Sequence, residues 1–197
     1  MLSVYLLRHG ETVYNADGNR YCGRTDADLT EKGVAQARQV ATALEGVAID
    51  AVYASPLKRA YLTAEIASGG QRVAQDDRLI ELDFGTWEGK TREAFIREAP
   101  DLWASWNAAP DHTRAGGTGD TALEVVDRVD DFFTEMIKKY DGKTLMVVAH
   151  NGVNRLYLAW KLGMPLKYYR RIAQENSSIT LVQFGGPEEF AVLKLNA

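Results

Sequence analysis

The feature that most constrains this chain is its first apolar run and the turn that follows it. Residues 2–7 are mostly apolar, which is typical of a strand buried in a sheet. The run ends abruptly at Arg8, His9 and Gly10. A cation, an imidazole and a glycine do not continue a core strand, but they suit the carboxyl edge of an open α/β sheet, where ligands bind. We therefore expect the first strand to deliver functional side chains.

Strand-like and helix-like segments alternate along the 197 residues, without a linker or an internal repeat. This alternation favours an α/β fold with a largely parallel sheet. We treat residues 1–197 as one domain with a lid-like insertion around residues 91–119. The predicted strands are residues 2–7, 49–54, 71–74, 144–149, 178–184 and 190–195. The predicted helices begin near Thr30, Pro56, Thr91, Thr121 and Val153.

Several helix signals are local. Ser55 is predicted to be an N-cap, with Pro56 at the first helical position. Thr121 and Glu124 form a capping-box pattern at the start of a long amphipathic helix. Residues 15–28 and 108–119 are polar or contain Gly and Pro, so we expect a loop in each place, the second of them mobile.

Charge and cysteine content exclude some classes of function. The net charge of −4 argues against a nucleic-acid or anionic-membrane partner. The chain has one cysteine, Cys22, so an internal disulfide is excluded, and no Cys/His spacing suggests a metal site. With no signal-peptide pattern at the N-terminus, the expected location is the cytoplasm.

Four side chains are predicted to meet at one edge of the sheet. Arg8 and His9 follow the first strand, Arg59 lies in the first turn after the second, and His150 follows the apolar strand 144–149. Helix N-termini at this edge add free N–H groups and partial positive charge. Two imidazoles and two guanidinium groups predict a pocket for a dianion, with phosphate as the candidate, because a planar guanidinium can bind two oxygens.

A neutral imidazole in such a pocket can attack phosphorus and form a covalent intermediate. One ring nitrogen of His9 then needs an acceptor that fixes the tautomer. The leaving alkoxide needs a proton from an acid that stands apart from the arginines in apolar surroundings, and Glu81, between Ile80 and Leu82, fits this description. Taken singly, Arg59 could be a surface residue and Glu81 an ion-pair partner, so the interpretation depends on their joint placement.

Five blocks carry a resemblance that spans nearly the whole chain. They are residues 8–12 with Asn15; Gly23, Asp26, Leu29, Thr30, Gly33, Gln36 and Ala37; residues 55–60 with Thr63 and Ala64; Glu81 with residues 84–89; and His150 with Gly152 and Arg155. Together they resemble the histidine phosphatase superfamily, also called phosphoglycerate-mutase-like proteins. The resemblance implies a three-layer α/β/α fold with a mixed, mostly parallel central sheet.

The same resemblance implies roles for individual residues. His9 would be the nucleophile and Glu81 the proton donor. Phosphate would be bound by Arg8, Arg59 and His150, with Asn15 assisting. No metal and no organic cofactor would be needed. The partner would be a small phosphorylated metabolite.

The interval from Glu81 to His150 is short, whereas mutases of the family carry extra chain there, so we expect a phosphatase. A phosphoglycerate-type mutase is one alternative. The other is a non-catalytic module that binds phosphorylated ligands. The presence of both His9 and Glu81 argues against the non-catalytic module.

The substrate and the oligomeric state, including a homodimer, stay open. Cys22 and Asn151 depart from the common family residues, and with Asn15 and Gly23 they are the predicted substrate-binding residues. The layout of the loop before Thr30 is similar to alpha-ribazole phosphatases and to broad-specificity members. Trp103 and Trp106 suit either substrate contact or packing of a helix onto the core.

Overall fold

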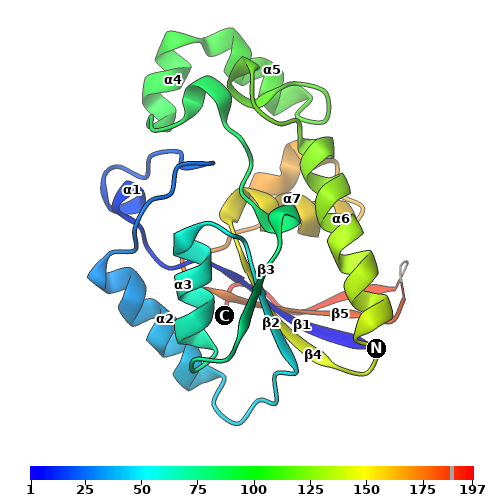
Figure 1. Ribbon diagram of the computed structural model, residues 1–197. Coiled ribbons are helices and arrows are strands. Elements are labelled where there is room, and N and C mark those ends of the chain that lie inside the picture. The colour runs from blue at the N-terminus through cyan, green and yellow to red at the C-terminus, as the bar shows by residue number, and fades with distance from the viewer. Residues whose placement is uncertain (187–188) are drawn as a thin grey trace.

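A computed structural model gives the structure of residues 1–186 and 189–197, which are built around a six-stranded sheet (Figure 1). The strand order is β3-β2-β4-β1-β5-β6, with parallel pairing from β3 to β1 and antiparallel pairing of β5 with β1 and β6. This confirms the expected mixed, mostly parallel sheet. The strands are β1 Leu2–Arg8, β2 Ala51–Ala54, β3 Val73–Gln75, β4 Thr144–Ala149, β5 Ile179–Phe184 and β6 Phe190–Lys194.

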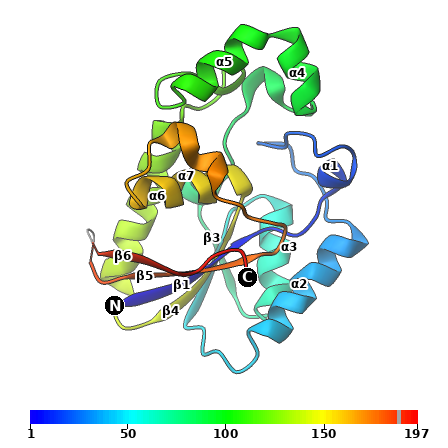
Figure 2. The same ribbon diagram turned by 180° about the vertical axis from the view of Figure 1, so that it is seen from behind.

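Helices cover both faces of the sheet, as Figures 1 and 2 show. Helices α2 and α3 pack together on one face, and α6 and α7 pack together on the other. The α-helices are α1 Val13–Ala16, α2 Glu31–Ala43, α3 Lys58–Ala67, α4 Arg92–Glu98, α5 Pro100–Ala108, α6 Ala122–Lys139 and α7 Asn151–Lys161. Short 3₁₀ helices are η1 Asp77–Leu79, η2 Gly85–Trp87, η3 Ala115–Gly117 and η4 Leu166–Arg171. In the described part of the chain, no helix has the length and apolar character needed to cross a membrane.

The two faces of the sheet hold two separate hydrophobic cores. Val4 and Leu6 of β1 belong to the larger core, under α6 and α7, whereas Leu7 belongs to the smaller one, under α2 and α3. Strand β4 is buried over nearly its whole length, and its side chains likewise alternate between the larger and the smaller core. Because successive strand residues point to opposite faces, an apolar run of this kind requires cover on both sides. This burial holds the carboxyl ends of β1 and β4 at fixed positions.

Two predicted helix starts are wrong. Helix α3 begins at Lys58 with Leu57 as N-cap, because Ser55 still belongs to the strand ladder, where its N–H donates to the carbonyl of Val148. Helix α7 begins at Asn151, two residues before the predicted start at Val153. The capping box of Thr121 and Glu124 is confirmed.

Residues 91–119, which we call the cap segment, form α4, α5 and η3 and lie beyond the end of the sheet (Figure 1). Trp87 is the centre of an aromatic cluster. Its ring centroid lies 4.7 Å from that of Phe95, 5.7 Å from Trp103 and 6.0 Å from Trp106. Trp106 is fully buried, so the packing alternative holds for this residue.

The stretch expected to be a mobile loop, residues 108–119, is hydrogen-bonded to the chain that follows Glu81. The Thr86 hydroxyl donates to the carbonyl of Gly116 at 2.8 Å, and the N–H of Asp120, the residue after this stretch, donates to the carbonyl of Asp83 at 3.0 Å. The predicted polar loop after the nucleophile turn begins within a four-residue helix, α1. Within this loop, the N–H of Tyr21 donates to the carbonyl of Lys90 at 2.9 Å, so both stretches are held against the rest of the molecule.

Candidate active site

His9 sits at the end of β1, where its N–H donates to the carbonyl of Ala149 at 3.1 Å. Its ring Nδ1 lies 2.7 Å from the carbonyl oxygen of Gly10. A carbonyl only accepts, so Nδ1 carries the proton and Nε2 keeps its lone pair. The N–H of Gly10 in turn donates to Thr63 Oγ1 at 3.0 Å. The acceptor predicted for the His9 ring is thus the carbonyl of the next residue, Gly10. Both the carbonyl and the N–H of Gly10 are hydrogen-bonded, which fixes the turn.

The nucleophile turn is packed against the first turn of α2 by two glycines. A Cβ on Gly10 would lie 2.5 Å from the carbonyl oxygen of Gly33. A Cβ on Gly33 would lie 2.1 Å from the carbonyl oxygen of Glu11. Both obstructing atoms belong to the backbone, so only glycine fits at either position.

His150 lies next to His9, with their ring centroids 5.2 Å apart. Its Nε2 is 2.7 Å from Ser55 Oγ, while its buried Nδ1 has no hydrogen-bond partner. Burial, followed by the positive charge of Arg59, lowers the pKa of both histidines well below 6.5. Both rings are therefore neutral at neutral pH, as nucleophilic attack by His9 requires.

Two arginines, the half-buried Arg8 and the buried Arg59, leave donors unpaired beside these rings. Arg8 donates from Nη1 to the carbonyl of Gln174 at 2.9 Å, and its Nε has no partner. Arg59 donates to the carbonyl oxygens of Thr25 at 2.7 Å and Gly23 at 2.8 Å, and its Nε is likewise unpaired. Burial lowers the pKa of Arg8 to about 10, which still leaves it charged at neutral pH. The pair provides positive charge for an anion.

Glu81 lies at the N-terminus of α7. Its Oε1 accepts the N–H groups of Leu82 at 2.9 Å and Val153 at 3.1 Å, and its Oε2 accepts the N–H of Gly152 at 3.1 Å. Its negative charge also raises the pKa of Arg8 against the effect of burial. The expectation of apolar surroundings apart from the arginines is therefore wrong, because neighbours along an extended backbone point in different directions.

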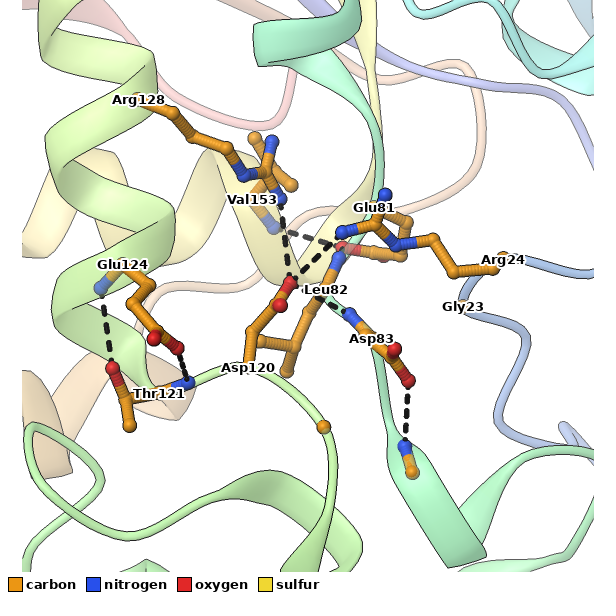
Figure 3. Close-up of polar contacts among 12 residues, drawn as sticks. Gly23, Arg24, Glu81, Leu82, Asp83, Asp120, Thr121, Glu124, Arg128 and Val153 are labelled. Atoms are coloured by element: carbon orange, nitrogen blue, oxygen red, sulfur yellow. Dashed lines mark hydrogen bonds and ion pairs between the residues drawn. The ribbon is translucent and has the colours of Figure 1, made fainter.

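A network around Asp120 joins three segments near Glu81 (Figure 3). Asp120 Oδ2 accepts from the backbone N–H of Asp83 at 3.0 Å and from Arg24 at 3.1 Å, and it lies 3.9 Å from Arg128. Burial lowers the pKa of Arg128 to about 10. No local motif predicts this network, since its members lie up to about a hundred positions apart.

A cavity of about 400 Å³ opens beside His9. Of the predicted site residues, the cavity is lined by Arg8, His9, Asn15, Cys22, Glu81 and Asn151. Arg59, His150 and Gly23 are not among its lining residues. Gly23 instead donates its N–H to Glu88 at 2.9 Å and accepts from Arg59. Burial raises the pKa of the Cys22 thiol to about 11.

Several residues that line the cavity were not among the predicted site residues, among them Arg155, Tyr169 and Arg170. Arg155 was named only as part of the block around His150. Its position four residues after Asn151, on the same helix face, could have marked it as a site residue. Within residues 1–186 and 189–197, no cluster of three or more His, Cys, Asp or Glu side chains could hold a metal ion. The geometry therefore offers a neutral imidazole with a free lone pair in a cavity whose walls carry positive charge.

Comparison with known proteins agrees with this chemistry. The model of the histidine phosphatase superfamily (branch 1) matches residues 4–197. Phosphoserine phosphatase 1 of Hydrogenobacter thermophilus is 34% identical over 198 residues, covering 100% of this chain and 92% of that protein. The adenosylcobalamin/alpha-ribazole phosphatase of Salmonella typhimurium is 34% identical over 171 residues, covering 83% and 81%. The structure of phosphoserine phosphatase in complex with 3-phosphoglyceric acid, from Entamoeba histolytica, superposes with a TM-score of 0.90 at 29% identity, covering 100% and 98%.

Proposed function

The chain belongs to the histidine phosphatase superfamily, and we propose that it hydrolyses small phosphomonoesters through a phosphohistidine on His9. The observation that carries the role of His9 is its hydrogen bond from Nδ1 to the carbonyl of Gly10. This bond leaves the Nε2 lone pair free in a cation-lined cavity, on a ring that burial keeps neutral. No other imidazole among the described residues lines this cavity.

The reaction proceeds in two displacements. First, Nε2 attacks phosphorus, the bond from phosphorus to the ester oxygen breaks, and Glu81, which reacts in its protonated form, gives its proton to the leaving oxygen. Second, water attacks the phosphohistidine while Glu81 takes a proton from that water. The bond from phosphorus to Nε2 breaks, and inorganic phosphate and the starting form of the enzyme result. Glu81 suits both proton transfers because it is buried and lines the cavity next to His9.

Positively charged and hydrogen-bond-donating groups around the phosphorus stabilise the charge that develops on the phosphoryl oxygens, and a neutral histidine acts here as a donor. We assign this role to Arg8, Arg59 and His150, with Asn15 assisting at the cavity wall. The Nε atoms of both arginines and Nδ1 of His150 are buried without partners, so they are available to a phosphoryl group. For His150 this requires Ser55 Oγ to donate to Nε2, which leaves the proton on Nδ1.

The substrate side of the cavity is assigned to Asn15, Cys22 and Asn151. The cap segment is proposed as a lid, since Arg92 and Glu93 of α4 also line the cavity. Gly23 has only an indirect role in this proposal, through its contacts with Arg59 and Glu88. A cytoplasmic location and a homodimer stay predictions, the second testable by light scattering of the purified protein.

The phosphoenzyme can be trapped directly. After mixing with a radiolabelled phosphomonoester and quenching in base, the wild type is expected to carry acid-labile, base-stable phosphate on His9. His9→Ala should carry none, and its release of phosphate should fall at least roughly 10³-fold. The exposed His112 in the cap segment provides the control, since His112→Ala should keep both label and activity. Equal phosphate release by wild type and His9→Ala would overturn the proposal.

The same preparation separates a phosphatase from a mutase. With 3-phosphoglycerate as substrate, we expect inorganic phosphate to form faster than 2-phosphoglycerate. The short interval between Glu81 and His150 supports this expectation. Isomerisation that exceeds phosphate release would make the chain a mutase while leaving the role of His9 intact.

A further inference from the structure

Two guanidinium groups share one aromatic ring on the wall of the cavity. The guanidinium carbon of Arg155 lies 5.2 Å from the ring centroid of Tyr169, and that of Arg170 lies 4.6 Å from the same centroid. Arg170 also stacks on Trp103 at 4.5 Å and donates to Asn107 Oδ1 at 2.9 Å. All three residues of the Arg–Tyr–Arg stack line the cavity. The stack is therefore held in place from α5, α7 and η4.

The charges of this stack are not balanced within the described residues, where neither arginine forms an ion pair with a carboxylate. Nε of Arg155 and Nη2 of Arg170 are buried without a hydrogen-bond partner. Burial lowers the pKa of Arg155, with the nearby charge of Arg170 adding to the effect. Cations that are partly withdrawn from water and close to each other are costly unless an anion joins them. By contrast, Arg20, another cavity residue, has its own partner in Asp17 at 2.6 Å.

The position of the stack relative to the phosphoryl site follows from helix geometry. Asn151 and Gly152, at the start of α7, line the phosphoryl end of the cavity beside His9. Arg155 lies four residues further along the same helix, a rise of about 6 Å. Besides burial, the charge of Arg155 also helps to lower the pKa of Arg8, so its guanidinium lies near the phosphoryl end of the same cavity. One small molecule can therefore reach both places in a cavity of about 400 Å³.

We propose that the stack of Arg155, Tyr169 and Arg170 is a carboxylate subsite, and that the preferred substrates are phosphomonoesters of short hydroxy acids or hydroxy amino acids. Arg155 binds the carboxylate with its guanidinium fork, and Arg170 adds charge and positions the Tyr169 ring. The inference rests on the proposed function, because it places the phosphate at His9. It adds a substrate class that the phosphoryl chemistry does not determine.

Stacking of arginine on tyrosine is by itself a common surface feature, and the chain offers a matched example. Arg171 lies 3.9 Å from the ring centroid of Tyr168, but it is exposed to water and does not line the cavity. Loss of this guanidinium removes the same charge and the same kind of stack. Arg171→Met is therefore the control for Arg155→Met, which keeps the apolar stem of the side chain.

The test uses substrate pairs that differ by one carboxylate: O-phosphoserine against O-phosphoethanolamine, and 3-phosphoglycerate against glycerol 3-phosphate. We expect the wild type to prefer the carboxylated member in kcat/KM by roughly 10²-fold, the size of a charged hydrogen-bonded contact. Arg155→Met should lose this preference, with activity on p-nitrophenyl phosphate within about threefold of wild type. Arg155→Lys should recover part of the preference, and Arg171→Met should keep all of it.

The outcomes separate this inference from the proposed function. Activity on p-nitrophenyl phosphate without preference in either pair would overturn the carboxylate subsite alone. An equal loss on all five substrates in Arg155→Met would also overturn it, since the residue would then serve folding or phosphoryl transfer. No activity of the wild type on any substrate would overturn the proposed function and the subsite together.

Discussion

The two ends of the cavity are built in different ways. At the phosphoryl end, His9 and His150 stand where buried strands end, and backbone groups hold His9 and Glu81. At the far end, Arg155, Tyr169 and Arg170 are held mainly by stacking on one another and on the cap segment. The first arrangement depends on the sheet, and the second on side chains that pack between helices. The reaction and the choice of substrate are therefore expected to respond to different mutations.

The largest expected effect at the phosphoryl end, apart from loss of His9, is that of Glu81→Gln. The amide keeps the shape of the side chain but cannot give a proton to the leaving oxygen. We expect kcat to fall roughly 10²–10⁴-fold for alkyl phosphates. The loss should be smaller for p-nitrophenyl phosphate, whose leaving group needs little protonation. Equal losses on both kinds of substrate would argue that Glu81 only positions α7 through its bonds to Gly152 and Val153.

In the cap segment, Trp106→Ala should lower the stability of the fold rather than the rate of phosphoryl transfer. Removal of a fully buried tryptophan is expected to lower the free energy of unfolding by about 3–5 kcal/mol, as measured by urea denaturation. The matched change at Trp160, which is 38% exposed, should cost much less. Activity on p-nitrophenyl phosphate, corrected for the folded fraction, should change little. A loss of activity in the folded protein would show that the two ends are coupled.

The third expected effect concerns pH and belongs to the phosphoryl end. Because the pKa values of His9 and His150 lie well below 6.5 in the folded state, the unfolded chain takes up more protons as the pH falls through 6.5. Their contribution is complete above pH 6.5 and is lost on acidification, at up to about 1.4 kcal/mol per pH unit for each histidine. Urea denaturation at pH 8, 7, 6 and 5 would measure this slope.

His150→Gln should flatten the dependence on pH below 6.5, whereas His112→Gln, at an exposed position, should leave it unchanged. A slope that is the same in all three proteins would mean that other groups cause it. Retention of the slope in His150→Gln, with its loss in a His9 variant, would assign it to His9 alone.

The residues of the phosphoryl end could be predicted because the sequence patterns that place them are local. A continuous apolar run predicts a strand covered on both faces, and the polar residues directly after β1 and β4 must then lie at the edge of the sheet. The placement of Arg8, His9 and His150 followed from this rule. The start of α7 did not, because the capping group is Glu81, a side chain some seventy positions away that accepts the N–H groups of Gly152 and Val153.

The far end of the cavity was beyond this kind of reasoning. Trp103 and Trp106 occupy neighbouring turns of one helix, but only the fold decides that Trp106 is core while Trp103 supports Arg170. Tyr169 contacts two arginines, one from η4 and one from α7. No spacing in the sequence predicts these contacts. Segments that combine through tertiary packing leave no local pattern from which to infer a contact.

The contact between Gly10 and Gly33 has a genetic consequence. A damaging substitution at a packed site can often be rescued by a smaller side chain opposite it. Here the atoms opposite each glycine are backbone carbonyls, of Gly33 and Glu11 respectively, so no change of side chain can make room. A selection for revertants of Gly10→Ala should therefore return true reversion to glycine and no suppressor at the facing position. The close packing of the nucleophile turn against α2 therefore requires glycine at both positions.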